Sequence, residues 1–383
     1  MAPGAGSSPP RTSPALGNRP GLDGLRAIAV GLVLLHHTAA ILIPREAGSF
    51  FTGGFLGVDL FFVLSGFLIT TLLLERRERR EARPLRSFYA RRALRLLPAV
   101  AALLVGNVLV AMVEEKGVGD AIGSFWVVFS YTTNWALLYG FGHLSPNLSH
   151  LWSLAIEEQF YAVWPLVLLG ALSLGLARRR MAWICVALAV AAAVWRAALY
   201  ESGSEWLEIY IRTDARADAL LIGAALALVR PDLMLARLHP RLRSAMGSVA
   251  LILLIGIASR VHGSSGSLYL GGYTVVALLA GALICVELAG PWALHPVLAS
   301  RPMVLVGRLS YSLYLWHFLV FRVVDQHVAE SSTVLRVALG WVVTIAVSVA
   351  SFHLVERPAL RVKDRIGRRD RVERAGPRPA PAP

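Results

Sequence analysis

The chain has 383 residues, of which 56% are hydrophobic and only 16% are charged, and its mean hydropathy is +0.59. Soluble globular domains are less apolar than this, and the apolar residues here fall in long blocks, so the composition predicts a multi-pass membrane protein. The net charge of +14 does not indicate a nucleic-acid partner, because the arginines cluster between the apolar blocks as the positive-inside rule requires.

The two ends of the chain differ from this apolar middle. Residues 1–20 are rich in Pro, Gly and Ser and lack an apolar stretch, which is typical of a disordered arm and not of a signal peptide. Residues 361–383 form a basic, Pro-rich tail that we also expect to be disordered. Residues 21–360 then form one transmembrane domain without an internal repeat, and we expect no second folded domain.

Ten stretches are long enough to cross a bilayer as helices, at about 20 residues each. They are residues 24–44, 54–75, 94–113, 152–176, 181–200, 214–230, 245–260, 268–289, 307–325 and 333–355. A further aromatic stretch, residues 124–141, contains Thr132, Thr133 and Asn134 and is expected to be interfacial or re-entrant, with an eleventh full span as the alternative. The predicted fold is an all-α bundle of about ten transmembrane helices.

The arginines predict the orientation of the bundle. The segment "RRERREARPLRSFYARRALR", residues 76–95, lies between the second and third spans and should be cytoplasmic. With ten spans, the basic segments 178–180 and 230–243 then also lie inside, together with both termini. An eleventh span would place those segments outside, which counts against it.

The first span contains ionisable residues, which are costly in a membrane and usually functional. Arg26 and His37 are eleven positions apart, which places them within about 20° of one helix face and about 16 Å apart along the axis. His36 lies roughly 80° away. Arg26 and His37 are therefore candidate site residues; the alternative is a snorkelling arginine and a structural histidine.

The second span carries Asp59 at its outer end, which could act as the partner of a histidine or could pair with an arginine. In the same span, Ser65 and Gly66 are expected to permit close helix packing.

The segment "SHLWSLAIEEQFYAVWPL" carries two adjacent carboxylates into a span, and packing alone does not explain them. Glu157 and Glu158 point in different directions because they are neighbours. His150 is seven residues before Glu157 and shares its face if the helix already includes that histidine. We expect at least one of the two glutamates to be functional.

The segment "RTDARADALLIG" places Asp214 and Asp218 on one helix face, with Arg212 and Arg216 nearby. This pattern favours an internal ion-pair network over a catalytic site.

The ninth span, in "GRLSYSLYLWHFLVF", has a polar stripe of Ser310, Tyr314 and His317 that should face the bundle interior. His317 could be either a structural or a site residue. Glu356, at the end of the last span, is expected to pair with an arginine of the basic loop.

The two cysteines, Cys185 and Cys285, show neither disulfide nor metal-ligand spacing and are expected to be core residues. No metal site is predicted.

The motifs "LDGLRAIAVGLVLLHH", "GVDLFFVLSGFLI", "FYARRALRLLPA", "HLWSLAIEEQFY", "GRLSYSLYLWH" and "VERP" occur in this order. Over about residues 20–360 the chain resembles the acyltransferase-3 family of polytopic bacterial O-acyltransferases. The resemblance implies that Arg26 and His37 are the family's catalytic pair and that Arg92 and Arg95, beside Arg91, match its arginine-rich motif. Several members carry a C-terminal esterase-like domain, for which this chain is expected to be too short.

The resemblance also implies the reaction, transfer of an acyl group, acetyl by default, from cytoplasmic acyl-CoA to a sugar hydroxyl, with no bound cofactor. The nine arginines from Arg76 to Arg95 form a basic belt suited to the phosphates of CoA. The general base would be His37, oriented by Glu157 or Asp59, or His37 would itself be acylated. The remaining site residues are assigned as acyl-CoA-binding, Arg91, Arg92 and Arg95, and as acceptor-binding or pore-lining, His150, Glu158, Ser310, Tyr314 and His317.

Two other classes of function remain open at this point. Membrane Asp, Glu and His residues also build the relays of proton-coupled transporters, although the sequence has no repeated pattern of interrupted helices. A purely structural scaffold would not need Arg26 and His37 on one face. The expected acceptor is a sugar, a lipid-linked glycan or a glycosylated metabolite, and the expected location is the cell membrane.

Overall fold

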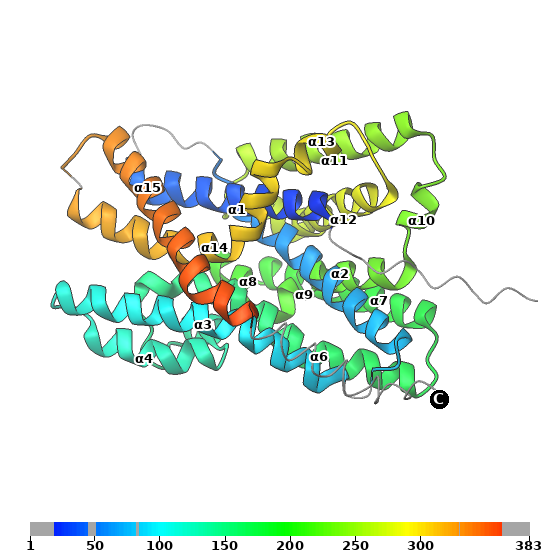
Figure 1. Cartoon of the computed structure of the whole chain (residues 1–383), viewed down its shortest axis with the longest axis horizontal. Coiled ribbons are helices and arrows are strands. Elements are labelled where there is room, and N and C mark those ends of the chain that lie inside the picture. The colour runs from blue at the N-terminus through cyan, green and yellow to red at the C-terminus, as the bar shows by residue number, and fades with distance from the viewer. Residues whose placement is uncertain (1–18, 45–50, 82–83, 329, 362–383) are drawn as a thin grey trace, which may run out of the picture.

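The computed structural model describes residues 19–44, 51–81, 84–328 and 330–361. The expected N-terminal arm and C-terminal tail lie outside the described residues except for their inner ends. In the described part, nine helices are long and apolar enough to cross a membrane, so the predicted all-α transmembrane bundle is confirmed (Figure 1). Cys185 and Cys285 are both buried, as expected.

The helices that make up these nine spans are α1 (Pro20–His37), α2 (Gly57–Glu78), α3 (Pro84–Val113), α6 (Trp152–Ser173), α7 (Arg178–Glu201), α11 (Pro240–Arg260), α12 (Tyr273–Ala289), α14 (Arg301–His327) and α15 (Thr333–Ser351). Short π-helical segments extend α1, α12 and α15: η1 (Thr38–Leu42), η5 (Leu268–Gly272) and η6 (Phe352–Glu356). Other short elements are η3 (Gly54–Leu56), η4 (Pro146–Leu151), α8 (Trp206–Ile211), α10 (Asp232–Leu235) and α13 (His295–Leu298).

The sixth predicted span is shorter than the others. Helix α9 (Thr213–Val229) has 17 residues, or about 26 Å, against a hydrocarbon core of about 30 Å. Most of its residues are buried, and it packs against both α2 and α7. A helix surrounded by protein does not have to match the lipid thickness. Among the described residues, nine helices therefore reach the length of a span, and α9, at the position of the sixth expected span, does not.

Glycine contacts bring α2 and α9 together at backbone distance. A Cβ atom on Gly66 would lie 1.9 Å from the carbonyl oxygen of Leu220, and one on Gly223 would lie 2.1 Å from that of Val63. Gly66 therefore permits close packing, as the sequence predicted. Ser65 has a different contact, because its hydroxyl donates to the Glu157 carboxylate.

The stretch 124–141 is not one helix. Helix α4 (Val118–Phe129) ends before Tyr131, whose φ is 55°, and α5 (Thr133–Tyr139) follows. The amide of Gln159 on α6 donates to the carbonyl oxygen of Tyr131 at 2.8 Å and to Oδ1 of Asn134 at 3.0 Å, which holds this turn against the bundle. Because neither helix is long enough to cross a bilayer, the alternative of an eleventh continuous span is wrong.

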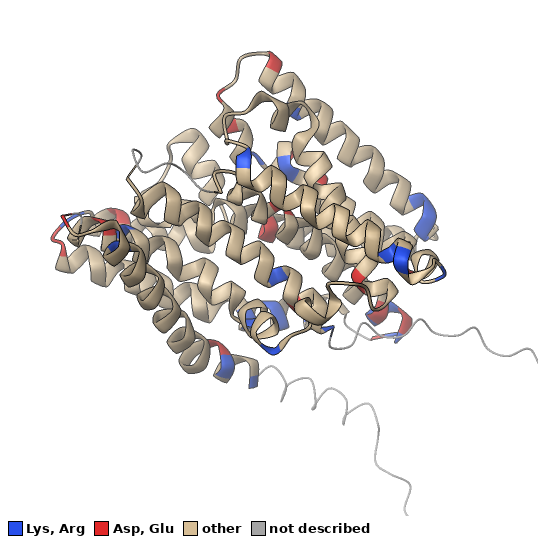
Figure 2. Cartoon of the chain, turned by 90° about the horizontal axis from the view of Figure 1, so that it is seen from above, with Lys and Arg blue, Asp and Glu red and all other residues tan. Residues whose placement is uncertain are grey.

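The basic segments gather at one end of the bundle, which we call the inner end. Arg178 at the start of α7 pairs with Glu78 at the end of α2, with 2.8 Å between Nη2 and Oε1. At the opposite, outer end, Thr52 donates to the carbonyl oxygen of Val261 at 2.8 Å. In Figure 2 the ribbon positions of charged residues lie mostly at the helix ends, with a few in the middle of the bundle. The basic segments that follow α2 and that begin α7 thus lie at the same end of the bundle, as expected if successive spans cross the membrane in alternating directions.

This arrangement predicts the accessibility of single cysteines introduced in place of exposed residues. In a background in which both native cysteines are replaced, Ser264→Cys at the outer end should react with an impermeant maleimide in intact cells. Arg179→Cys at the inner end should react only after permeabilisation, because the positive-inside rule places it in the cytoplasm. The reverse pattern would show that the bundle is inverted.

Candidate functional site

Two of the cavities lined by described residues lie inside the bundle, one in its inner half and one in its outer half. The inner cavity has a volume of about 180 Å³, and the outer cavity one of about 200 Å³. Arginines and a glutamate mark the inner cavity, which is lined by Arg26, Arg92, Arg95, Glu157, Ser310 and Tyr311, among others. Histidines and aromatic residues mark the outer cavity, which is lined by His36, His37, His150, Trp152, Trp206 and Tyr210, among others.

The three arginines of the inner cavity differ in their partners. Arg92 on α3 forms a bidentate ion pair with Glu158 on α6, and its guanidinium lies 3.3 Å from the centre of the Tyr161 ring. Arg26 and Arg95 form no hydrogen bond or ion pair with any described residue, although both line the cavity. These two guanidinium groups are therefore available to an anionic ligand.

Glu157 and Glu158, which are neighbours in sequence, have separate roles in the structure. Glu158 is committed to Arg92, so the expectation that it binds the acceptor or lines the pore is not supported by its contacts. Glu157 lines the inner cavity and accepts hydrogen bonds from the hydroxyls of Ser65 and Tyr161, the latter at 2.7 Å. It therefore lies in a different cavity from His37 and does not orient that ring.

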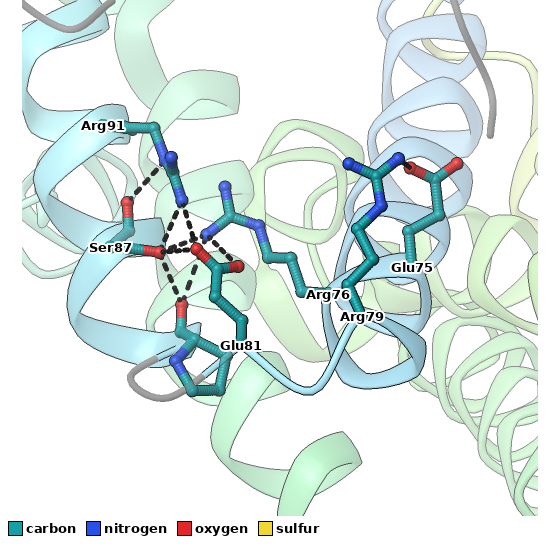
Figure 3. A network of polar contacts seen from close by, with 7 residues as sticks. Glu75, Arg76, Arg79, Glu81, Ser87 and Arg91 are labelled. Carbon is teal, nitrogen blue, oxygen red and sulfur yellow. Dashed lines mark hydrogen bonds and ion pairs between the residues drawn. The ribbon is translucent and has the colours of Figure 1, made fainter. Parts of the chain in front are cut away.

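Arg91, predicted to bind acyl-CoA, belongs to a polar network that joins the end of α2 to the start of α3 (Figure 3). Its Nη2 lies 2.9 Å from Oε1 of Glu81 and 2.5 Å from the Ser87 hydroxyl. Arg76 donates to the same hydroxyl at 2.6 Å and lies 3.6 Å from Glu81. Since Arg91 is absent from the lining of the inner cavity, its contacts favour a structural role.

The hydrogen bonds around His37 assign the nitrogen that can act as a base. Nδ1 of His317 lies 2.7 Å from the carbonyl oxygen of Tyr314, so it carries a proton and leaves Nε2 of His317 as an acceptor. Nδ1 of His37 lies 3.2 Å from that Nε2 and 3.0 Å from the carbonyl oxygen of Val33, so it is the donor. The second nitrogen of His37, Nε2, then keeps its lone pair, and no described residue donates to it.

His317 therefore takes the orienting position that the sequence gave to a carboxylate. Asp59, the other candidate, is 1% exposed and accepts a hydrogen bond from Arg216 at 2.7 Å. The expectation that Asp59 or Glu157 orients His37 is corrected: the ring is held by a backbone carbonyl and a second imidazole. His36, although rotated away on the helix, also lines the outer cavity, with its ring centre 5.1 Å from that of His37.

His150 and Tyr314 connect the outer cavity to the α14 stripe. The ring of His150 stacks on Phe318 at 4.9 Å, and its Nε2 lies 3.2 Å from the carbonyl oxygen of Leu315. Its Nδ1 is buried without a partner among the described residues. The predicted stripe is thus brought into the interior: Ser310 lines the inner cavity, Tyr314 lines both cavities, and His317 contacts His37.

The Asp214–Asp218 segment forms the ion-pair network that the sequence favoured, with one partner that the sequence missed. Asp214 pairs with Arg212 at 2.7 Å. Asp218 pairs with Arg196 of α7 at 2.9 Å, and both side chains are almost completely buried. The sequence missed Arg196 because it lies on a different helix and no local spacing links it to Asp218.

Glu356 does not have the arginine partner that was expected. Its carboxylate is buried and accepts a hydrogen bond from the hydroxyl of Ser312 on α14, and no ion pair to an arginine forms among the described residues. This contact ties the end of the last span to α14.

Comparison with known proteins gives a family match over nearly the whole chain. A family model described as an acyltransferase domain matches residues 19–353. Peptidoglycan O-acetyltransferase OatA of Listeria monocytogenes is 34% identical over 357 residues, which cover 88% of this chain and 55% of that protein. The Bacillus subtilis protein named "Putative peptidoglycan O-acetyltransferase YrhL" is 35% identical over 358 residues, which cover 88% of this chain and 54% of that protein.

A Staphylococcus aureus protein named "Putative O-acetyltransferase SACOL0978" is 32% identical over 351 residues, 57% of its length. The chain thus spans about half the length of these relatives. No solved structure matches it.

The network in Figure 3 gives a pH-dependent prediction for stability. Burial disfavours the charged form of Glu81, but the charge of Arg76 and the hydrogen bonds from Ser87 and Arg91 outweigh it and hold the pKa of Glu81 below its usual 4.5. A depressed pKa stabilises the fold above the unfolded-state value, and this stabilisation is lost as the pH falls through the folded-state value.

We therefore expect Glu81→Gln to lower the melting temperature of the detergent-solubilised protein at pH 7, and the difference from the unsubstituted protein to shrink as the pH falls below about 4. The exposed Glu205→Gln is the matched control and should melt like the unsubstituted protein at both pH values. A constant difference for Glu81→Gln across this range would show that its charge is not what matters.

Proposed function

The chain belongs to the acyltransferase-3 family, and on this premise we propose that it is a membrane O-acyltransferase that moves an acyl group from acyl-CoA to a carbohydrate hydroxyl. The observation that carries the proposal is the pair of cavities, one with unpaired arginines and one with a basic histidine nitrogen, that meet at shared residues. The arginines suit a phosphate-bearing donor, and the histidine suits the removal of a proton from an alcohol.

The donor would enter from the inner end, which the arginine distribution makes cytoplasmic. Arg26 and Arg95 are the guanidinium groups of the inner cavity without a described protein partner, so they would bind the phosphate or amide oxygens of acyl-CoA. Arg92 would contribute through the positive charge it retains beside Glu158. Acetyl is the default acyl group, since the names of the relatives specify O-acetyl transfer.

The transfer step follows from the position of His37. Its Nε2 takes the proton of the acceptor hydroxyl, and the hydroxyl oxygen attacks the thioester carbonyl carbon. An O–C bond forms as the C–S bond breaks, and the electron pair of the broken bond leaves with the sulfur of CoA. The proton then passes from His37 to that sulfur, so the products are an ester and the CoA thiol. His317 stabilises the protonated ring by holding Nδ1.

The acceptor would occupy the outer cavity. The rings of Trp152, Trp206 and Tyr210 line it, and such rings offer an apolar face for a sugar ring and polar edges for its hydroxyls. The Listeria and Bacillus relatives carry peptidoglycan in their names, so we propose a cell-wall glycan as the acceptor of this chain.

The experiment that tests this function measures transfer of radiolabelled acetyl from acetyl-CoA to peptidoglycan fragments by membranes that contain the protein. We expect His37→Ala to lower transfer by about 10²–10⁴-fold, the usual contribution of a general base, at an unchanged amount of membrane protein. His36→Ala serves as the comparison and should retain more activity, because it removes a ring that does not contact His317. No transfer by the unsubstituted protein, or full activity in His37→Ala, would contradict the proposal.

The donor site gives a separate prediction. Arg95→Ala should raise the KM for acyl-CoA by about tenfold and leave the KM for the acceptor unchanged, because a charge-assisted hydrogen bond to phosphate contributes about 1.5–3 kcal/mol. Arg91→Ala, which removes a neighbouring arginine outside the cavity, should not change the KM for acyl-CoA. Equal effects of the two substitutions would indicate that the belt acts through general charge and that Arg95 has no particular contact.

A further inference from the structure

The inner and outer cavities meet at two side chains. Among the described lining residues, Val58 of α2 and Tyr314 of α14 are the pair that belongs to both cavities. A donor held by Arg26 and Arg95 and an acceptor beside His37 would therefore bring their reacting atoms together at this junction. We infer that Val58 and Tyr314 form the acyl-binding site and limit the length of the acyl chain, an inference that rests on the proposed function.

The Tyr314 side of this site is fixed. The hydroxyl of Tyr314 donates to the carbonyl oxygen of His150 at 2.6 Å and accepts a hydrogen bond from the Ser153 hydroxyl at 2.6 Å. Moving the ring aside would break two buried hydrogen bonds, and unpaired polar groups in a bundle interior are costly. The ring is therefore a rigid wall that does not swing away to admit a larger acyl group.

The Val58 side is fixed by the close packing of its neighbour in sequence, Gly57, against helix α1. A Cβ atom on the preceding Gly57 would lie 2.3 Å from the carbonyl oxygen of Ala29 and 3.0 Å from a methyl group of Val33. Helices α1 and α2 therefore touch at backbone distance at Ala29, about two turns before His37, which leaves α2 no space to move closer to α1. Val58, itself only 6% exposed, is held between this contact and the cavities.

A site with two rigid walls selects by volume. Packed interiors respond to the addition of a single methylene group, and one methylene in an apolar pocket changes discrimination by about 10–200-fold. The wall groups are a valine side chain and an aromatic ring, so the site favours an uncharged acyl group, and each added methylene has to fit between two fixed walls.

The test is a competition for transfer between acetyl-CoA and butyryl-CoA, with the two ester products quantified by mass spectrometry. Val58→Ala removes two methyl groups from the wall and should raise the butyryl-to-acetyl product ratio by about tenfold or more. Val63→Ala is the matched control: it removes the same two methyl groups from a buried position of the same helix that lines neither cavity. Its product ratio should equal that of the unsubstituted protein.

A second substitution keeps the inference testable if Val58→Ala does not accumulate in the membrane. Val58→Leu enlarges the same wall and should lower butyryl transfer more than acetyl transfer. Product ratios that stay unchanged in both Val58 variants, or that change equally in Val63→Ala, would overturn the inference and leave the proposed function intact. Absence of any transfer by the unsubstituted protein would overturn the proposed function and this inference with it.

Discussion

The ion pair between Asp59 and Arg216 joins α2 to α9 where neither side chain meets water, since each is 1% exposed. In a bilayer every buried charge has to find its partner within the protein. Arg196 and Asp218 do the same between α7 and α9, and the Arg216 guanidinium also lies 3.8 Å from the centre of the Tyr273 ring on α12. Removing one member of such a pair leaves an uncompensated charge, at about 3–5 kcal/mol, so these contacts fix the positions of α2, α7, α9 and α12 together.

The same constraint gives meaning to the polar groups that have no partner. Arg26 and Arg95 line the inner cavity without donating a hydrogen bond to any described residue, while the nearby Arg92 is paired with Glu158. The buried Nδ1 of His150, which lines the outer cavity, also lacks a partner among the described residues. The bundle pairs Asp59, Asp218 and Glu158 with arginines, whereas these groups stay open at the positions where the proposed donor and acceptor bind.

Much of this could be predicted from the sequence, because the relevant signals are local. Hydropathy located the long helices, and the arginine clusters predicted which helix ends lie on the same side of the bundle. Helical phase placed Arg26 and His37 on one face of α1. Helical phase does not, however, say which residues of two different helices will touch. His317 lies 280 residues from His37, and no spacing could have favoured it over Asp59 as the partner of that ring. For the same reason the sequence expected an arginine beside Glu356, where the fold places a serine.

Helix α1 explains why two chemically different cavities can serve one reaction. Arg26 and His37 share its face but lie about 16 Å apart along the axis, so under the proposed function one rigid element carries an anion-binding group at one level and a base at another. Helix α2 carries Val58, which lines both cavities, and its backbone contact with α1 at Gly57 fixes the position of α2 against α1. Under the proposed function, the donor and the acceptor approach from opposite ends and neither has to cross the bundle. The acyl group alone passes the junction, and the size of that junction then decides which acyl group it is.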